Sequence, residues 1–222
     1  PIAPEVLQDM LEAASRASTC GNMQLYSLIV TQSRELREAL APCHFNQPMV
    51  TQAPCVITVC ADVHRFSMWC EQRDAEPCYD NFAWFLNGVT DALLAAQNLC
   101  VEAEAHGLGI CYLGTTIYTA EEIARILDLP KGVIPVTTIV VGHPDESPEL
   151  TDRLPLDAVV HCEKYHHYTS SEIDELWAEK ETSEETRRLL EENGLPNLAQ
   201  IFTRNRYRAE DNLAISRNYF AL

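Results

Sequence analysis

The pattern of apolar and polar residues along the first 150 residues predicts helices that alternate with strands. A helix is expected over residues 3–18, because its apolar residues recur with the i, i+3, i+4, i+7 spacing of one helical face. These residues are Leu7, Met10, Leu11 and Ala14. Short apolar segments typical of strands follow at 25–32, 54–62, 110–116 and 132–144, and a short edge strand is expected at 159–165. The segment 54–62 is apolar on both faces, which predicts a central strand.

The longest helical pattern spans residues 80–106, about 40 Å at a rise of 1.5 Å per residue. Three polar side chains interrupt its apolar stripe: Asp91, Gln97 and Asn98. We interpret them as hydrogen-bonded core residues or as interface residues, because buried polar groups are nearly always paired. A helix this apolar is expected to be buried on more than one side, for instance in a dimer.

Shorter helices are expected at 33–40, around Phe66 and Trp69, and at 120–130, where Thr119 and Glu122 have the spacing of a capping box. The last part of the chain is charged and helical and has too few apolar residues for a core of its own. We therefore expect one domain at 1–168 and a helical extension at 169–222 that packs on the domain or on a partner subunit. The expected fold class is α+β, with a mostly antiparallel sheet flanked by helices.

The composition narrows the classes of function. The chain has 222 residues, of which 46% are hydrophobic, and this is enough for a sizeable core. Its formal net charge of −17 argues against nucleic acid or an anionic membrane as a partner. No apolar segment reaches the roughly 18 residues of a membrane span. The chain begins at Pro1 without a methionine, so we expect further residues upstream.

The nine cysteines predict neither disulfides nor a metal site. Their number is odd, most lie in apolar segments and no C-x-x-C pair occurs, so we interpret them as small buried residues in a reducing cytoplasm. One cluster, "HCEKYHH" (161–167), contains ligand-type side chains. Neighbouring strand residues point to opposite faces, which disfavours a shared metal, and a zinc protein stays an alternative hypothesis.

The segment "AHGLGICYLGTT" (105–116) contains three glycines. A dinucleotide-binding loop follows a strand and opens a helix, whereas these glycines follow a helix and precede a strand, so a phosphate-binding role is not expected. Gly107 has the position of a helix C-cap. Gly114 ends the apolar residues 110–113, where bare backbone can approach a ligand closely, although two structural turns would explain the glycines as well.

Small polar residues are concentrated between the first helix and the first strand. Ser18, Thr19, Cys20, Asn22 and Gln24 offer hydroxyl, thiol and amide groups without charge. This set suits a flat heteroaromatic ring with donors and acceptors at its edge, and a helix C-cap followed by a polar loop explains it equally well. No G-x-S-x-G, H-E-x-x-H or carboxylate pair is present, so no catalytic side chain is expected.

Five segments together resemble the nitroreductase family of FMN-dependent oxidoreductases, in particular its larger, NADPH-preferring, oxygen-insensitive branch. They are "PIAPEVLQDMLEAASRAS", "GNMQLYSLIV", "VTQAPCVITVCAD", "GVTDALLAAQNLCVEAEAHGLGICYLGTT" and "PELTDRLP". The resemblance implies a homodimer with one FMN at each of two subunit interfaces. It also implies ping-pong hydride transfer from NADPH or NADH to nitroaromatic, quinone or flavin acceptors, with the chemistry on FMN.

The resemblance also implies which residues contact the cofactor. They are Ser18, Thr19, Cys20, Asn22 and Gln24, then Gln47, and then Leu113, Gly114 and Thr115 along the flavin. Arg153 matches a phosphate-binding arginine, whereas Thr151 stands where the family usually has a lysine. The family's basic Arg-x-Ser-x-Arg segment would lie upstream of Pro1.

Three arginines alternate in "TRNRYRAE": Arg204, Arg206 and Arg208. They are candidates for the 2′-phosphate of NADPH, and pairing with nearby acidic residues on a solvated face is the alternative. A second alternative concerns the whole chain. The threonine at position 151 favours a non-catalytic flavin or ligand-binding protein of the same fold.

Overall fold

The computed structural model describes residues 1–221. The chain divides into two compact units, one of residues 1–146 together with the end of the chain from residue 215, and one of residues 147–214. The functional boundary expected at residue 168 stays a prediction.

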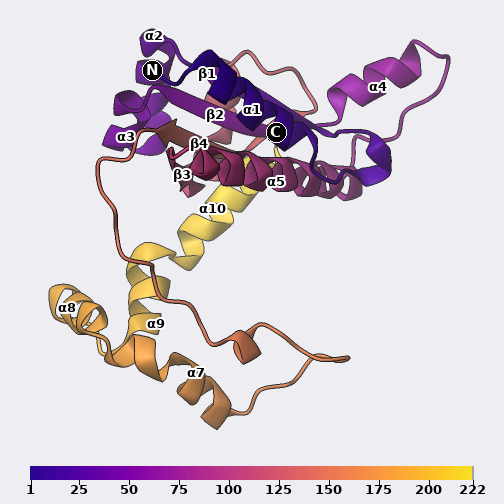
Figure 1. Ribbon diagram of the computed structural model, residues 1–222. Coiled ribbons are helices and arrows are strands. Elements are labelled where there is room, and N and C mark those ends of the chain that lie inside the picture. Colours follow the sequence, from indigo (N-terminus) through magenta and orange to yellow (C-terminus); the bar gives the residue numbers. More distant parts are fainter. Residues whose placement is uncertain (222) are drawn as a thin grey trace. The chain divides into compact units, whose positions relative to one another are not determined.

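The first unit is built on one four-stranded sheet (Figure 1). Its strands are β1 (Tyr26–Thr31), β2 (Cys55–Asp62), β3 (Gly109–Leu113) and β4 (Val133–Gly142). Their order is β1-β2-β4-β3, and every neighbouring pair is antiparallel. Every residue of β2 is buried, so the prediction of a central strand at 54–62 is confirmed.

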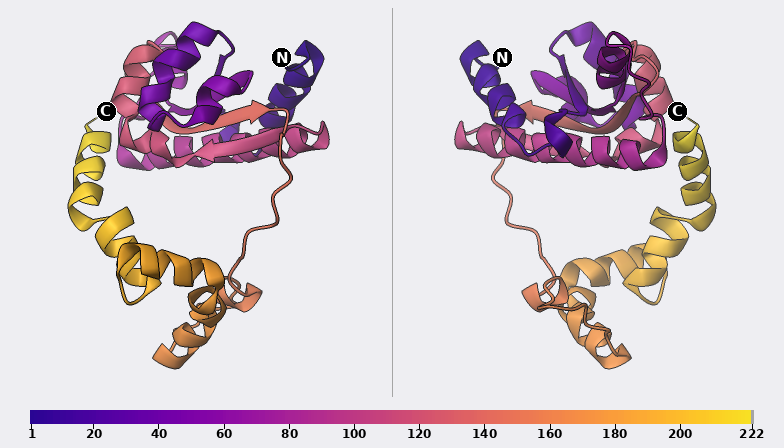
Figure 2. Two further views of the ribbon diagram at one scale, coloured as in Figure 1. Left: turned by 90° about the vertical axis from the view of Figure 1, so that its left-hand side faces the viewer. Right: turned by 90° about the vertical axis from the view of Figure 1, so that its right-hand side faces the viewer.

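Helices cover both faces of this sheet. On one face, α1 (Pro4–Ser15) and the 24-residue α5 (Phe82–Ala105) pack through Met10 and Leu99 against Ile57 of β2. On the other face, the 3-10 turn η2 (Ala41–His44) and α3 (Pro48–Gln52) pack against Val56. Figure 2 shows α5 extending along the sheet. The expected α+β fold is confirmed.

The remaining elements of the first unit are short. They are η1 (Cys20–Asn22), α2 (Arg34–Leu40), α4 (His64–Glu71), η3 (Gly114–Tyr118) and α6 (Ala120–Ile126). Gly107 has φ +73° directly after the C-cap of α5, which confirms the predicted glycine cap. No helix within residues 1–221 is long and apolar enough to cross a membrane.

The later part of the chain is helical, as expected. Its elements are η4 (Leu156–Ala158), α7 (Ser170–Thr182), α8 (Glu184–Asn193), α9 (Leu198–Ile201), the π-helical η5 (Phe202–Arg206) and α10 (Ala209–Phe220). The edge strand predicted at 159–165 is wrong, because these residues form turns and irregular backbone. Valine and tyrosine favour strands, but here no neighbouring strand pairs with them.

Two local predictions also need correction. The strand predicted at 110–116 ends at Leu113, and the backbone from Gly114 onwards forms η3. The capping box at Thr119 does not form, because the Thr119 hydroxyl donates to the Cys43 carbonyl over 2.8 Å. The capping box that does form joins Thr169 and Glu172 at the start of α7.

Candidate functional site

The loop between α1 and β1 is attached to α5 by one buried carboxylate. Asp91 is 2% exposed and accepts hydrogen bonds from the backbone N–H of Cys20 (2.9 Å) and of Leu25 (3.1 Å). The interpretation of Asp91 as a hydrogen-bonded core residue is therefore confirmed. One inner position of the loop, Cys20, and its C-terminal end, Leu25, are thus held to a single side chain of α5, which restricts the shape of the loop before any ligand arrives.

Inside this loop the backbone turns through left-handed conformations. Gly21, Asn22 and Gln24 have φ values of +54°, +57° and +49°. The Gln24 N–H donates to the Thr19 hydroxyl over 2.9 Å, and the Gln24 amide donates to the Asn22 side chain over 2.9 Å. Ser18 and Asn22 are exposed, while Thr19, Cys20 and Gln24 are partly buried. The loop therefore presents hydroxyl and amide groups on a fixed backbone.

A charged residue that the sequence did not single out supports the same loop from the side of β1. The Arg65 guanidinium donates to the Gln24 carbonyl and, over 3.1 Å, to the Tyr26 carbonyl. It also lies 3.4 Å from the buried carboxylate of Asp62. The only signal in the sequence is an aspartate that ends an apolar strand three residues before an arginine, and that spacing is common on surfaces.

A second group of expected site residues lies on the opposite face of the sheet from α5. Gln47 is half-buried at the start of α3, and Thr115 lies in η3 after the end of β3. His44 joins their two turns, because its Nδ1 is 2.8 Å from the Thr115 hydroxyl. The structure therefore brings Gln47 and residues 113–115 to one neighbourhood.

The two groups start from opposite edges of the sheet. The loop of residues 18–24 leads into β1, residues 113–115 follow β3, and these are the two edge strands. Three interstrand spacings of about 4.8 Å separate such edges by roughly 14 Å. Within one chain, the loop and the β3 end therefore lie at two separate places.

Gly114 has the geometry expected of a residue that lies against a ligand. A Cβ atom built on it meets no atom within 4 Å, and its φ lies outside the left-handed region. Neither packing within the chain nor backbone conformation therefore requires glycine here. Bare backbone next to open space, together with the exposed polar groups of the loop, fits a flat ring such as a flavin.

The remaining expected contacts belong to the unit of residues 147–214. The Arg153 guanidinium is exposed and donates to the Thr151 hydroxyl (2.6 Å) and to the Asp152 carbonyl (2.8 Å). Both bonds come from one guanidinium nitrogen, Nη1. The resemblance assigns this arginine to the cofactor phosphate. The remaining N–H groups of this exposed side chain face solvent and can pair with a phosphate.

The three alternating arginines differ in their surroundings. Arg208 forms a bidentate pair with Asp211 (2.7 and 2.9 Å) and lies 3.0 Å from Glu210. The Arg206 guanidinium lies 5.5 Å from the centre of the Phe202 ring. Arg204 is exposed. Arg208 is therefore largely committed to acids, and Arg204 and Arg206 are the better candidates for an anionic ligand.

The histidine-rich segment 161–167 forms contacts of another kind. The His166 ring lies 2.9 Å from the Glu172 carboxylate, whose pKa is lowered to about 2, mainly by the hydrogen bond from the Thr169 backbone. Among residues 1–221, no group of three or more histidine, cysteine or acidic side chains is placed to hold a metal ion.

All nine cysteines are free thiols, and five of them are buried.

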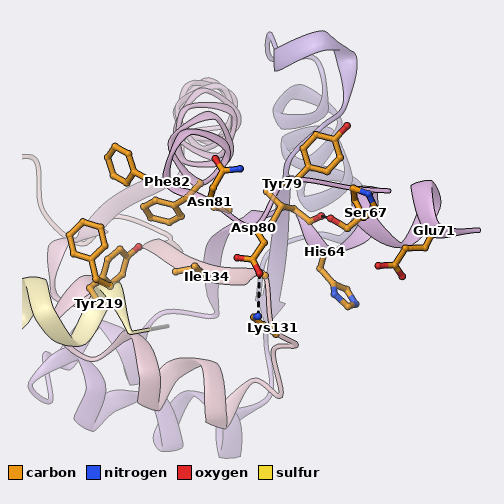
Figure 3. Close-up of a pocket in the computed structure, with 16 residues that line it drawn as sticks. His64, Ser67, Glu71, Tyr79, Asp80, Asn81, Phe82, Lys131, Ile134 and Tyr219 are labelled. Atoms are coloured by element: carbon orange, nitrogen blue, oxygen red, sulfur yellow. Dashed lines mark hydrogen bonds and ion pairs between the residues drawn. The ribbon is translucent and has the colours of Figure 1, made fainter. Parts of the chain in front are cut away.

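A cavity of about 510 Å³ lies between α4, the start of α5 and the end of α10 (Figure 3). Aromatic side chains form one wall, including Phe82, Phe85 and Tyr219, and the Lys131–Asp80 ion pair (3.3 Å) also lines the cavity. None of the expected cofactor contacts lines this cavity. It is therefore separate from both groups of candidate site residues.

Comparison with known proteins gives consistent matches. The sequence model of the Nitroreductase family matches residues 1–143. FMN reductase (NADPH) of Bacillus subtilis (strain 168) is 32% identical over 167 residues, which are 74% of this chain and 67% of that protein. A protein of Bacteroides fragilis NCTC 9343 of solved structure is 50% identical with a TM-score of 0.96, over 99% of this chain and 89% of that chain. The NfrA1 nitroreductase of B. subtilis is 26% identical with a TM-score of 0.83, over 98% and 91%.

Proposed function

The chain belongs to the nitroreductase family and is an NAD(P)H-dependent oxidoreductase that uses FMN, and we propose that it passes hydride to nitroaromatic, quinone or flavin acceptors by a ping-pong mechanism. FMN, when bound, supplies the hydride chemistry. The chain's own residues bind and orient the participants. No side chain needs to act as a catalytic acid or base.

The open space in front of Gly114 carries this proposal. Leu113, Gly114 and Thr115 offer bare backbone to one part of the cofactor, and Gln47 lies in the turn that His44 ties to Thr115. The Asp91-anchored loop offers hydroxyl and amide groups from Ser18, Thr19, Asn22 and Gln24, together with the Cys20 thiol. Arg153 is proposed to pair with the cofactor phosphate.

We propose a homodimer in which each FMN lies between two chains. The loop and the β3 end lie at opposite sheet edges, so two chains can combine the loop of one with the β3 end of the other. An exposed apolar stripe on α5 supports a subunit contact: Leu86, Leu93, Leu94 and Val101 are 51%, 43%, 44% and 56% exposed. Leu86 and Leu93 are seven residues apart, and so are Leu94 and Val101, which places the two pairs on one side of the helix.

Arg204 and Arg206 are proposed to receive the 2′-phosphate of NADPH. Replacing both with alanine should raise the KM for NADPH severalfold and leave the KM for NADH unchanged, because only NADPH has this phosphate. Arg208→Ala is the matched control, because Asp211 already occupies that guanidinium. Equal changes in both KM values for the double variant would contradict the assignment.

A visible spectrum of the purified full-length protein, before and after anaerobic addition of NADPH, tests the function. We expect a flavin absorbance of one FMN per chain that NADPH bleaches and that a quinone restores. Bound FMN that NADPH does not reduce would instead favour the non-catalytic binder. A protein that stays colourless with added FMN would contradict both, and the zinc hypothesis could then be tested by metal analysis.

A further inference from the structure

His44 is a buried histidine whose hydrogen bonding is incomplete. Its side chain is 0% exposed, Nδ1 lies 2.8 Å from the Thr115 hydroxyl, and Nε2 has no hydrogen-bond partner within residues 1–221. Loss of hydration lowers the pKa of His44 to about 4, so the ring is neutral at neutral pH. A neutral imidazole has one donor and one acceptor nitrogen, so Nδ1 can either donate to the threonine hydroxyl or accept from it.

A histidine in this environment stabilises the fold less than an apolar side chain of similar size would. Burying an unpaired polar nitrogen costs free energy that an apolar side chain of similar volume would not lose. The neighbouring core in this region is apolar, with Leu40, Cys43 and Ile123 packed together. The polar ring is therefore explained by its bond to Thr115 and not by packing.

The bond to Thr115 joins two turns that both contain expected flavin contacts. After His44, the non-glycine residues Phe45 and Asn46 have φ values of +55° and +54° and reverse the chain before Gln47. Such strained conformations persist where surrounding structure enforces them. The Gln47 N–H donates back to the His44 carbonyl over 3.1 Å, so the position of Gln47 depends on that of His44.

Two other contacts cross the same junction further from the expected flavin residues. The Thr119 hydroxyl donates to the Cys43 carbonyl over 2.8 Å, and the Phe45 and Tyr118 rings meet edge to face with centroids 6.1 Å apart. These contacts stabilise the junction as a whole. Of these three contacts, the His44–Thr115 bond is the one made by the residue next to Gly114.

We propose that His44 is a positioning residue of the flavin site, which fixes Gln47 and the Gly114–Thr115 backbone relative to each other so that both contact the same ring. The proposal rests on the proposed function, because it assumes that these residues contact FMN. It assigns a role to a residue that touches neither cofactor nor substrate.

The test is FMN titration of the full chain and four variants, with urea unfolding of each without FMN. His44→Phe keeps an aromatic ring and removes the bond, and Thr115→Val removes the same bond from the other side. His44→Asn places an amide where Nδ1 lies and should restore the bond. Thr119→Val is the control, because it removes a hydrogen bond at the same junction that does not reach Gly114.

We expect His44→Phe and Thr115→Val each to weaken FMN binding about five- to tenfold and to shift the visible spectrum of the bound flavin. His44→Asn and Thr119→Val should bind within about twofold of the unaltered protein. Unchanged binding by Thr115→Val and His44→Phe would overturn the proposal, and so would an equal loss in Thr119→Val. If His44→Phe does not fold, FMN binding by Thr115→Val compared with that by His44→Asn tests the proposal. Failure of the unaltered protein to bind FMN would contradict the proposed function instead.

Discussion

Replacing Asp91 should loosen the loop that we assign to the cofactor. The carboxylate accepts two backbone N–H groups, from Cys20 and Leu25, in a site that is 2% exposed. A hydrogen bond to a charged group contributes about 1.5–3 kcal/mol, so the loss of two in Asp91→Ala should cost about 3–6 kcal/mol of unfolding free energy. Asp91→Asn keeps one acceptor oxygen and should cost about half as much.

The assay is urea unfolding of the protein without FMN, followed by FMN titration under conditions where each variant is folded. Asp91→Asn should weaken FMN binding at least tenfold, because the loop loses one of its two bonds to the carboxylate. Asn98→Ala is the matched control, since Asn98 also connects α5 to backbone outside the helix, by donating to the Ala13 carbonyl, but is exposed. Should Asp91→Asn match Asn98→Ala in both stability and FMN binding, the carboxylate would not be the anchor of this loop.

Three further predictions follow from single positions. Gly114→Val should leave the unfolding free energy within about 0.5 kcal/mol, because its Cβ meets no atom of the chain, yet abolish FMN binding in a titration; retained binding would contradict a flavin at this position. The pKa of His44 falls from 6.5 to about 4 on folding, so between about pH 7.5 and pH 5 the unfolded chain gains a proton that the folded chain does not. The unaltered protein should therefore lose about 2 kcal/mol more stability than His44→Phe over that range, measured by urea unfolding, and parallel pH curves would refute this. Leu93→Glu should convert the proposed dimer to monomers in sedimentation experiments, because it places charge in the exposed apolar stripe of α5; a dimer that persists would place the subunit contact elsewhere.

The elements that the sequence predicts well are those whose pattern comes from burial. The spacing of Leu7, Met10 and Leu11 and the continuous apolar segment 54–62 reflect contact with a core, and α1 and β2 lie there. The strand predicted at 159–165 failed because strand propensity has no effect without a neighbouring strand. The capping box predicted at Thr119 does not form because the Thr119 hydroxyl donates to the carbonyl of Cys43, 76 residues earlier in the chain.

For the candidate site, the sequence suggests which residues to consider but not the contacts that hold them. The polar composition of residues 18–24 shows on the sequence, whereas their anchoring by Asp91 depends on a contact across 66 to 71 positions. Arg65 and His44 were missed for the same reason, since their partners are backbone carbonyls and a hydroxyl that only the fold brings near. Long-range hydrogen bonds leave no periodic trace along a chain.

The placement of the loop and the β3 end on opposite edges of the sheet has a genetic consequence. In the homodimer proposed above, each site would take one half from each chain, because the loop and the β3 end lie at opposite edges of the sheet. A defect at Gly114 and a defect at Asp91 would then damage different halves of each site. When two such defective chains are co-expressed, a mixed dimer has one site with both halves damaged and one site with both halves intact. Two inactive proteins should therefore complement each other, up to one FMN in every mixed dimer.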